Sequence, residues 1–206
     1  MIIKVCGLKE EDQIKQLDQL NSVNWLGSIF YSKSKRFVNT SSANITKSKK
    51  VGVFVNETID KTLEIARGNM LDILQLHGSE SSKMCFELKK KYTIIKAFGV
   101  DNDFDFSQLK AYKNKVDYFL FDTKTIKHGG SGKQFNWQIL DKYILTIPFL
   151  LSGGINSNSV QEIKEFKHPA FVGIDINSGF ENEPGVKNID KIKRFIEELE
   201  KVSSPI

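Results

Sequence analysis

The chain has 206 residues, of which 40% are hydrophobic and 27% charged, and these values are typical of one globular domain, which we expect to span residues 1–206. No segment approaches the run of about 18 apolar residues that a membrane-spanning helix requires, and the first residues do not resemble a secretory signal, so neither membrane insertion nor export is expected. The net charge is +5, but the lysines are scattered and arginines are scarce, which disfavours a nucleic-acid partner.

Short apolar segments, rich in β-branched and aromatic residues, recur along the chain and predict eight strands. These segments are Ile2–Cys6, Trp25–Phe30, Val51–Val55, Ile73–Leu76, Thr93–Phe98, Tyr118–Asp122, Phe149–Ser152 and Phe171–Ile176. Most of them are apolar on both faces. Strands of a parallel sheet that is covered by helices have this pattern.

Amphipathic segments lie between the predicted strands and indicate helices. They include Glu10–Leu20, Thr58–Met70, Ser81–Lys91, Phe106–Lys113 and Ile189–Lys201. Ser81 and Asn188 are helix-capping residue types at the starts of two of these segments. The segment Asn39–Lys50 is polar and weakly periodic, so we expect at most a short helix there.

Eight strand–helix units with parallel connections form either a closed barrel or an open doubly wound sheet. The number of units, the chain length and the absence of an early G-x-G-x-x-G motif favour the closed form. We therefore predict the α/β class and a single (β/α)₈ TIM barrel. In this fold the active site lies where the strands end and the following loops begin, and the chemically informative residues of the chain stand at those positions.

Cys6 ends the first predicted strand, two residues after Lys4 on the same strand face. A cysteine becomes a base only where a cation or a helix N-terminus stabilises its thiolate, and Lys4 is the nearest candidate. Cys6 could instead be a buried structural cysteine. Cys85 lies within an amphipathic segment and is expected in the core. Two cysteines are too few for a disulfide scaffold and fit a reducing compartment, so we expect a cytoplasmic protein.

Asp122 ends the sixth predicted strand, after four apolar residues. Burying a carboxylate there is costly unless the group has a partner or a role. Two interpretations remain open at this point. Asp122 is an acid or base of an active site, or it pairs with Lys124 or caps its loop.

Glycines cluster after each of the last three predicted strands. They occur in the stretch Gly129, Gly130, Ser131 and Gly132, in the pair Gly153 and Gly154, and in the pair Ser178 and Gly179. Glycine lets the backbone approach a ligand closely, and backbone N–H groups at helix starts bind anions. These glycines therefore predict a phosphate site. We also expect residues 125–133 to close over the ligand as a lid.

Three further polar residues stand at strand ends. Arg36 has a planar guanidinium group that matches a carboxylate, although a surface role is equally open. His77 is interpreted as a hydrogen-bonded structural histidine rather than a base. Asp175 could pair with Lys4, because the first and last strands adjoin in a closed barrel. The histidines and cysteines have no zinc-site spacing, so no metal is expected.

Seven motifs of the chain, taken in order, resemble phosphoribosylanthranilate isomerase from Lys4 to about Asn188. They are KVCGL, FYSKSKRFV, VGVFVN, LQLHGSE, FDTKTIKHGGSGKQFNW, LLSGGINSNSV and DINSGFENEPGVKN. The resemblance implies a (β/α)₈ barrel of tryptophan biosynthesis without a metal or organic cofactor. It also suggests a monomer whose partner is its small-molecule substrate.

The reaction that the resemblance implies is the Amadori rearrangement of N-(5-phosphoribosyl)anthranilate to 1-(2-carboxyphenylamino)-1-deoxyribulose 5-phosphate. Asp122 would protonate the ribose ring oxygen, and Cys6 would remove the C2′ proton. Arg36 would hold the anthranilate carboxylate. The phosphate would be held by Gly130, Ser131, Gly132, Gly153, Gly154, Ser178 and Gly179.

The chain departs from the family pattern at several positions near the proposed site. Lys9, Asn136, Asn177 and Phe180 replace the usual residues, and residues 155–160 lack the usual proline–glutamate pair. The changes at Asn177 and Phe180 bear on details of phosphate contact. The alternatives are the histidine-pathway isomerase, in which an aspartate is expected where this chain has Cys6, and a phosphate-binding barrel without activity.

Overall fold

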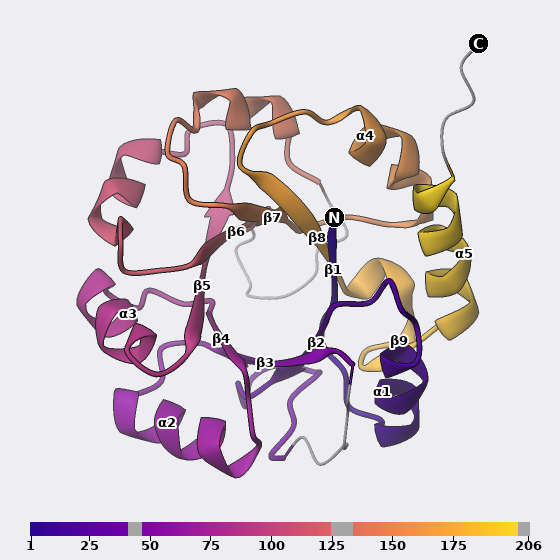
Figure 1. Cartoon of the computed structure of the whole chain (residues 1–206), viewed down its shortest axis with the longest axis horizontal. Helices are drawn as coiled ribbons and strands as arrows, with labels where there is room; N and C mark the ends of the chain where they lie inside the picture. Colours follow the sequence, from indigo (N-terminus) through magenta and orange to yellow (C-terminus); the bar gives the residue numbers. More distant parts are fainter. Residues whose placement is uncertain (41–46, 125–133, 202–206) are drawn as a thin grey trace.

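The computed structural model describes residues 1–40, 47–124 and 134–201. In these residues eight parallel strands close into one barrel, in the order β1 to β8, and helices surround it (Figure 1). The strands are β1 (Ile2–Val5), β2 (Trp25–Ile29), β3 (Lys49–Phe54), β4 (Ile73–Leu76), β5 (Thr93–Val100), β6 (Tyr118–Thr123), β7 (Phe149–Leu151) and β8 (Phe171–Ile176). The prediction of a (β/α)₈ barrel is confirmed.

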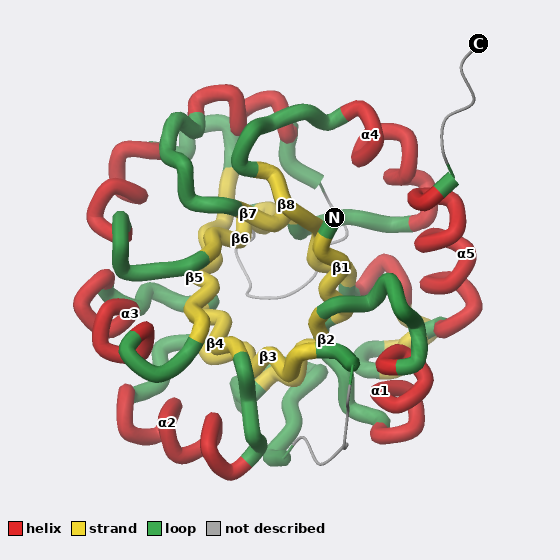
Figure 2. The backbone as a smooth tube through the Cα atoms, viewed as in Figure 1, coloured by secondary structure: helices red, strands yellow, loops and turns green. Residues whose placement is uncertain are grey.

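Helical elements form the outer ring that Figure 2 shows around the strands. The α-helices are α1 (Glu11–Asp18), α2 (Ile59–Gly68), α3 (Ser82–Lys89), α4 (Val160–Glu165) and α5 (Ile189–Glu200). The 3₁₀ helices are η1 (Phe106–Tyr112), η2 (Trp137–Lys142), η3 (Ser157–Ser159) and η4 (Ser178–Phe180). The predicted caps are confirmed, since Ser81 accepts a hydrogen bond from the Met84 amide and Asn188 from the Lys191 amide.

One predicted element differs from the structure, and another is only partly described. Residues 106–113 were expected to form an α-helix, but the segment is the 3₁₀ helix η1. No helix occurs in the described part of 39–50, because Lys49 and Lys50 pair with Trp25 and Leu26 of β2 and so belong to β3. Residues 41–46 lie outside the described part of the chain.

The core has two layers, inside and outside the barrel. Alternate strand residues point inward and fill the barrel below its mouth: Trp25, Val51, Ile73, Ile95, Ala97, Leu120 and Leu150. A larger apolar cluster, which includes Cys85, lies between the strands and the helices. Within the described residues, the helices are all too short or too polar to cross a membrane.

The small hairpin of β9 (Glu181–Glu183) and β10 (Val186–Lys187) follows η4 at the end of β8. A hairpin was not expected there. It brings Glu181 and Lys187 to the mouth of the barrel, where both become part of the site.

Candidate active site

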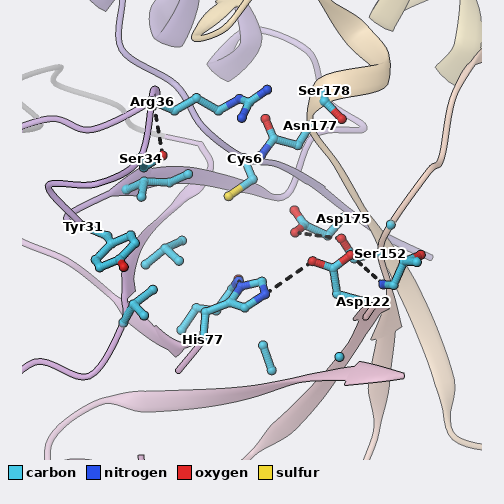
Figure 3. A pocket seen from close by; sticks show the side chains of 18 of the residues that line it. Cys6, Tyr31, Ser34, Arg36, His77, Asp122, Ser152, Asp175, Asn177 and Ser178 are labelled. Carbon is cyan, nitrogen blue, oxygen red and sulfur yellow. Dashed lines mark hydrogen bonds and ion pairs between the residues drawn. The ribbon is translucent and has the colours of Figure 1, made fainter. Parts of the chain in front are cut away.

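A cavity of about 340 Å³ opens where the barrel strands end. Its lining includes most of the site residues predicted from the sequence: Cys6, Arg36, Asp122, Gly153, Gly154 and Ser178. Figure 3 shows Cys6 and Asp122 directed into this space from separate walls. Two strands, β7 and β8, separate β1 from β6 in the barrel, so a ligand between the two side chains can be reached from different sides.

The remaining predicted glycines do not line the cavity in the described structure. Gly130, Ser131 and Gly132 lie outside the described residues, as does the whole predicted lid. Gly179 lies against the backbone of the preceding loop, because a Cβ atom there would lie 2.2 Å from the carbonyl oxygen of Ile155. Its lack of a side chain lets the loop after β8 pack directly on the loop after β7.

Cys6 lies beside a buried ion pair of the strands β1 and β8. Lys4 is fully buried, and its Nζ atom lies 2.8 Å from Oδ1 of Asp175, which is opposite Lys4 in the parallel register. The predicted pairing of Lys4 with Asp175 is therefore confirmed. Burial raises the pKa of the Cys6 thiol, whereas the positive charge of the nearby Lys4 ammonium acts to lower it.

Gly27 of β2 leaves room for this arrangement. A Cβ atom at this position would lie 3.0 Å from Sγ of Cys6 and 3.3 Å from Nζ of Lys4. Such contacts are tighter than ordinary van der Waals packing allows. The absence of a side chain therefore lets the thiol and the ammonium group occupy one small space on the barrel wall.

Asp122 is held by its own loop and by His77. Its Oδ1 atom accepts a hydrogen bond of 2.8 Å from the amide of Thr123, and its Oδ2 atom lies 3.3 Å from Nε2 of His77. The alternative pairing with Lys124 is not formed, because Lys124 pairs with Asp101 at 2.6 Å. Gly153 has a φ of 83°, and a Cβ atom there would lie 2.6 Å from Oδ1 of Asp122.

His77 contributes to the site more directly than the sequence analysis indicated. It follows Ile73 and Gln75 along the inward face of β4, so its ring reaches the cavity and not the core. Nδ1 of His77 lies 2.9 Å from Nε2 of Gln75. The inward alternation of β4 was the signal in the sequence that could have identified His77 as a cavity residue.

Arg36 is engaged by Glu181, a residue that the sequence analysis did not select. Nε of Arg36 donates to Oε1 of Glu181 at 2.8 Å, and Nη2 donates to Oε2 at 2.5 Å. Nζ of buried Lys187 lies 2.6 Å from Oε1 of Glu181 and 2.7 Å from Oδ1 of Asn177. Although burial opposes its charge, these two cations hold the pKa of Glu181 below its ordinary value.

The cluster of Arg36, Glu181 and Lys187 has two positive charges and one negative charge. Glu181 uses the Nε–Nη2 edge of the guanidinium. Among the described residues no hydrogen bond is made by Nη1, which can donate to a second carboxylate. The cluster can therefore bind one further anion without burying an excess of negative charge.

Apolar side chains form another part of the cavity wall. They are Ile29, Tyr31, Val53, Val55 and Phe98. A planar apolar group could pack here while its charged substituents reach the polar side. In the described residues, no group of three or more His, Cys, Asp and Glu side chains is arranged to hold a metal ion.

Known proteins resemble this chain over nearly its whole length. The family model of N-(5′-phosphoribosyl)anthranilate (PRA) isomerase matches residues 3–198. The N-(5′-phosphoribosyl)anthranilate isomerase of Parabacteroides distasonis is 50% identical over 208 residues, which cover 97% of this chain and 93% of the relative.

Solved structures of the same enzyme have the same fold. One phosphoribosyl anthranilate isomerase, in complex with reduced 1-(o-carboxyphenylamino)-1-deoxyribulose 5-phosphate, is 29% identical with a TM-score of 0.80, over 97% of this chain and 98% of that one. Monomers of the dimeric enzyme from Thermotoga maritima are 28% identical with a TM-score of 0.79, over 98% and 100%. The chain therefore belongs to the N-(5′-phosphoribosyl)anthranilate isomerase family.

Proposed function

We propose that the cavity performs the Amadori rearrangement of N-(5-phosphoribosyl)anthranilate in tryptophan biosynthesis, with Asp122 as general acid and Cys6 as general base. The observation that carries this proposal is a thiol beside a buried ammonium group and a carboxyl group on another wall of the same cavity. An acid and a base on different sides of a ligand can act on both ends of an aminoaldose. The solved relative in complex with a reduced form of the product supports this choice of substrate.

The first step opens the ribose ring. Asp122 donates its proton to the ring oxygen, the bond between C1′ and that oxygen breaks, and the nitrogen lone pair forms a C=N bond. The oxygen leaves as a hydroxyl group on C4′. Asp122 is then a carboxylate, and the substrate is a protonated Schiff base.

The second step moves a proton from carbon. The Cys6 thiolate removes the proton from C2′, the released electron pair forms a C1′=C2′ bond, and the C=N pair returns to nitrogen. The resulting enolamine becomes the ketone when C1′ gains a proton and the hydroxyl group on C2′ loses one. The ammonium group of Lys4 stabilises the Cys6 thiolate on which this step depends.

The charged ends of the substrate match separate parts of the cavity. The anthranilate carboxylate is expected at Nη1 of Arg36, because the cluster of Arg36, Glu181 and Lys187 has a net charge of +1. Its aromatic ring is expected on the apolar wall near Tyr31.

The phosphate group is expected at the loops after β7 and β8. Gly153 and Gly154, with φ angles of 83° and 72°, bring the backbone close to the cavity beside Ser178. Gly179 serves indirectly, through the packing of the two loops. Backbone amides in such loops bind phosphate in many barrels of this class. Gly130, Ser131 and Gly132 remain predicted phosphate ligands, and residues 125–133 remain the predicted lid.

We further propose that the protein works as a monomer in the cytoplasm, without nucleic acid. The site residues named above belong to one chain, and the thiolate base needs a reducing environment, to which the two free cysteines conform. The Thermotoga maritima enzyme is dimeric, so the monomer proposal is tested by measuring the mass of this protein in solution. A dimer in sedimentation or light scattering would contradict the monomer.

The test is to mix the purified protein with freshly made N-(5-phosphoribosyl)anthranilate and to follow the loss of its anthranilate-type fluorescence. Asp122→Asn and Cys6→Ser should each lower kcat by about 10²- to 10⁴-fold. Absence of turnover by the unaltered protein, with the substrate confirmed intact, would refute the proposal. Turnover of the histidine-pathway aminoaldose alone would favour the alternative isomerase.

A further inference from the structure

Gln75 is a buried polar residue that the reaction above does not use. It follows Ile73 on the inward face of β4, and its side chain is 1% exposed. One side of its amide contacts His77, whereas its Oε1 atom has no hydrogen-bond partner among the described residues. A buried unsatisfied oxygen is costly, so its position inside the barrel calls for a reason.

Gln75, His77 and Asp122 form a continuous chain from the barrel interior to the proposed acid. Nε2 of Gln75 lies 2.9 Å from Nδ1 of His77, and Nε2 of His77 lies 3.3 Å from Oδ2 of Asp122. The other carboxylate oxygen, Oδ1, already accepts the Thr123 amide proton. Oδ2 is therefore the oxygen on which Asp122 can carry a proton.

The amide of Gln75 can face His77 with either of its two polar atoms. If Nε2 of Gln75 faces the ring, it donates a hydrogen bond to Nδ1 of His77, which is then unprotonated. The proton of a neutral His77 then lies on its Nε2 atom and points at an ionised Asp122. If the amide is rotated by 180°, Oε1 of Gln75 accepts a hydrogen bond from the protonated Nδ1 of His77. Nε2 of His77 can then share a proton with Oδ2 of Asp122. The rotation gives Oε1 of Gln75 a hydrogen bond and removes the one made by its Nε2 atom, so the number of hydrogen bonds stays the same.

Neighbouring charges favour the second arrangement. Burial raises the pKa of Asp175, and the positive charge of Lys4 lowers it. The negative charge of Asp122 also raises the pKa of Asp175, which means that the two carboxylates repel each other when both are ionised. A proton shared between Asp122 and His77 relieves this repulsion. Lys96 of β5 does not, because its ammonium group is held by Glu80 at 3.0 Å.

Resting on the proposed function, we propose that Gln75 is a positioning residue for the acid step. Its carbonyl oxygen keeps a proton on Nδ1 of His77, so that Nε2 faces Asp122, and the Asp122–His77 pair holds the additional proton that Asp122 transfers to the ribose ring oxygen. Gln75 also lines the cavity. With its carbonyl oxygen turned to Nδ1 of His77, it acts on the acid step through His77.

The position of the proton can be observed directly, because the chain has only three histidines. In the protein labelled with ¹⁵N-histidine, the resonances of His77 are assigned by their loss in His77→Asn. Nδ1 of His77 is expected to carry a proton at neutral pH in the unaltered protein. A proton on Nε2 alone would overturn the inference.

Kinetics of Gln75 variants test the same role, because a positioning residue for the acid step should change kcat and leave KM nearly unchanged. Gln75→Met, which removes both polar atoms, is expected to lower kcat about 10²-fold and leave KM within about twofold. Gln75→Glu keeps an acceptor for the Nδ1 proton and should retain more of kcat than Gln75→Met. Ile73→Val, on the same face of β4, is the packing control and should behave as the unaltered protein. Equal loss of kcat in Gln75→Met and Gln75→Glu would contradict the acceptor role.

Failure of this inference and failure of the proposed function give different results. If Asp122→Asn turns over as fast as the unaltered protein, the acid assignment itself is wrong. If Asp122→Asn is inactive but Gln75→Met has normal kcat, only the role of Gln75 is refuted.

Discussion

At the scale of single residues, the charged groups around the cavity occur in buried combinations rather than alone. Lys4 pairs with Asp175, and Lys187 and Arg36 share Glu181. A buried charge without a partner is costly, so a change in one member of a combination alters the chemistry of the others. Cys6 is an example, since the positive charges of Lys4 and Lys187 both act to lower the pKa of its thiol.

The pH dependence of the reaction should report the ionisation of Cys6. Burial raises the pKa of this thiol, and a base becomes active as pH rises through its pKa. The rising limb of the kcat/KM profile, which reports the base, should therefore extend from pH 7 to beyond about 8.5, the ordinary pKa of cysteine. The measurement is a profile of kcat/KM between pH 6 and 10.

Thiolate absorbance near 240 nm gives the control for this profile. Cys6→Ser leaves only Cys85, for which burial raises the pKa to about 11. Cys85→Ala leaves only Cys6, whose titration should coincide with the rise in kcat/KM. A rate that is flat with pH while Cys6 titrates would show that this thiol is not the base.

Lys187 should support substrate binding through the charge of its cluster. Lys187→Met makes the combination of Arg36 and Glu181 neutral, so the anthranilate carboxylate loses an attraction of ~1 kcal/mol, and KM should rise at least about fivefold. The matched control is Lys193→Met, an exposed position with the same change in net charge. If both variants raise KM equally, the effect comes from overall charge and not from the cluster.

At the scale of elements, each strand end is shaped by what lies on the neighbouring strand. Gly27 of β2 shows this most clearly, because its missing side chain makes space for Cys6 and Lys4 of β1. From the sequence, Gly27 belongs to the second predicted strand and has no evident role. Its role depends on the lateral register of β1 and β2, in which Lys4 is opposite Trp25, and a single strand contains no information about register.

Gly27→Ala should therefore impair catalysis without unfolding the barrel. The added methyl group would displace the thiol or the ammonium group, and we expect kcat/KM to fall about 10- to 100-fold. Gly68→Ala is the control, since a Cβ atom there would meet nothing within 4 Å. The prediction is wrong if the two variants have equal kcat/KM.

At the scale of the whole molecule, a buried ion pair connects successive loops of the barrel. Lys96 of β5 donates to Oε2 of Glu80 at 3.0 Å, and Glu80 in turn accepts the amides of Asn56 and Gly78. The loops after β3 and β4 are thereby joined to β5. Burial lowers the pKa of Lys96, and Glu80 opposes this shift.

Removal of this pair should destabilise the whole fold. Lys96→Met leaves Glu80 buried without its cation, and the free energy of unfolding should fall by about 3–5 kcal/mol. Unfolding in urea is the measurement. Lys61→Met, which removes an exposed pair with Glu64, should cost less than about 1 kcal/mol. Equal effects of the two variants would mean that Lys96 has no special structural role.

The sequence by itself determined the strands, the barrel and the positions from which chemistry acts. The predicted bounds of β4 and β8 agree with the structure, because apolar runs and helical periodicity are local properties of the chain. Cys6, Asp122 and Arg36 were selected because strand ends meet at the mouth of a parallel barrel, and all three line one cavity. The Lys4–Asp175 pair followed from strand parity and closure alone.

The tertiary structure alone decided the pairing of Arg36 with Glu181 and of His77 with Asp122. Glu181 is 145 residues from Arg36 in the chain, and it reaches Arg36 only through a hairpin that periodicity did not predict. His77 contacts Asp122 across the intervening strand β5. Hydrogen bonds require distances accurate to a few tenths of an ångström, and these depend on barrel register and loop packing, which are cooperative properties of the whole fold.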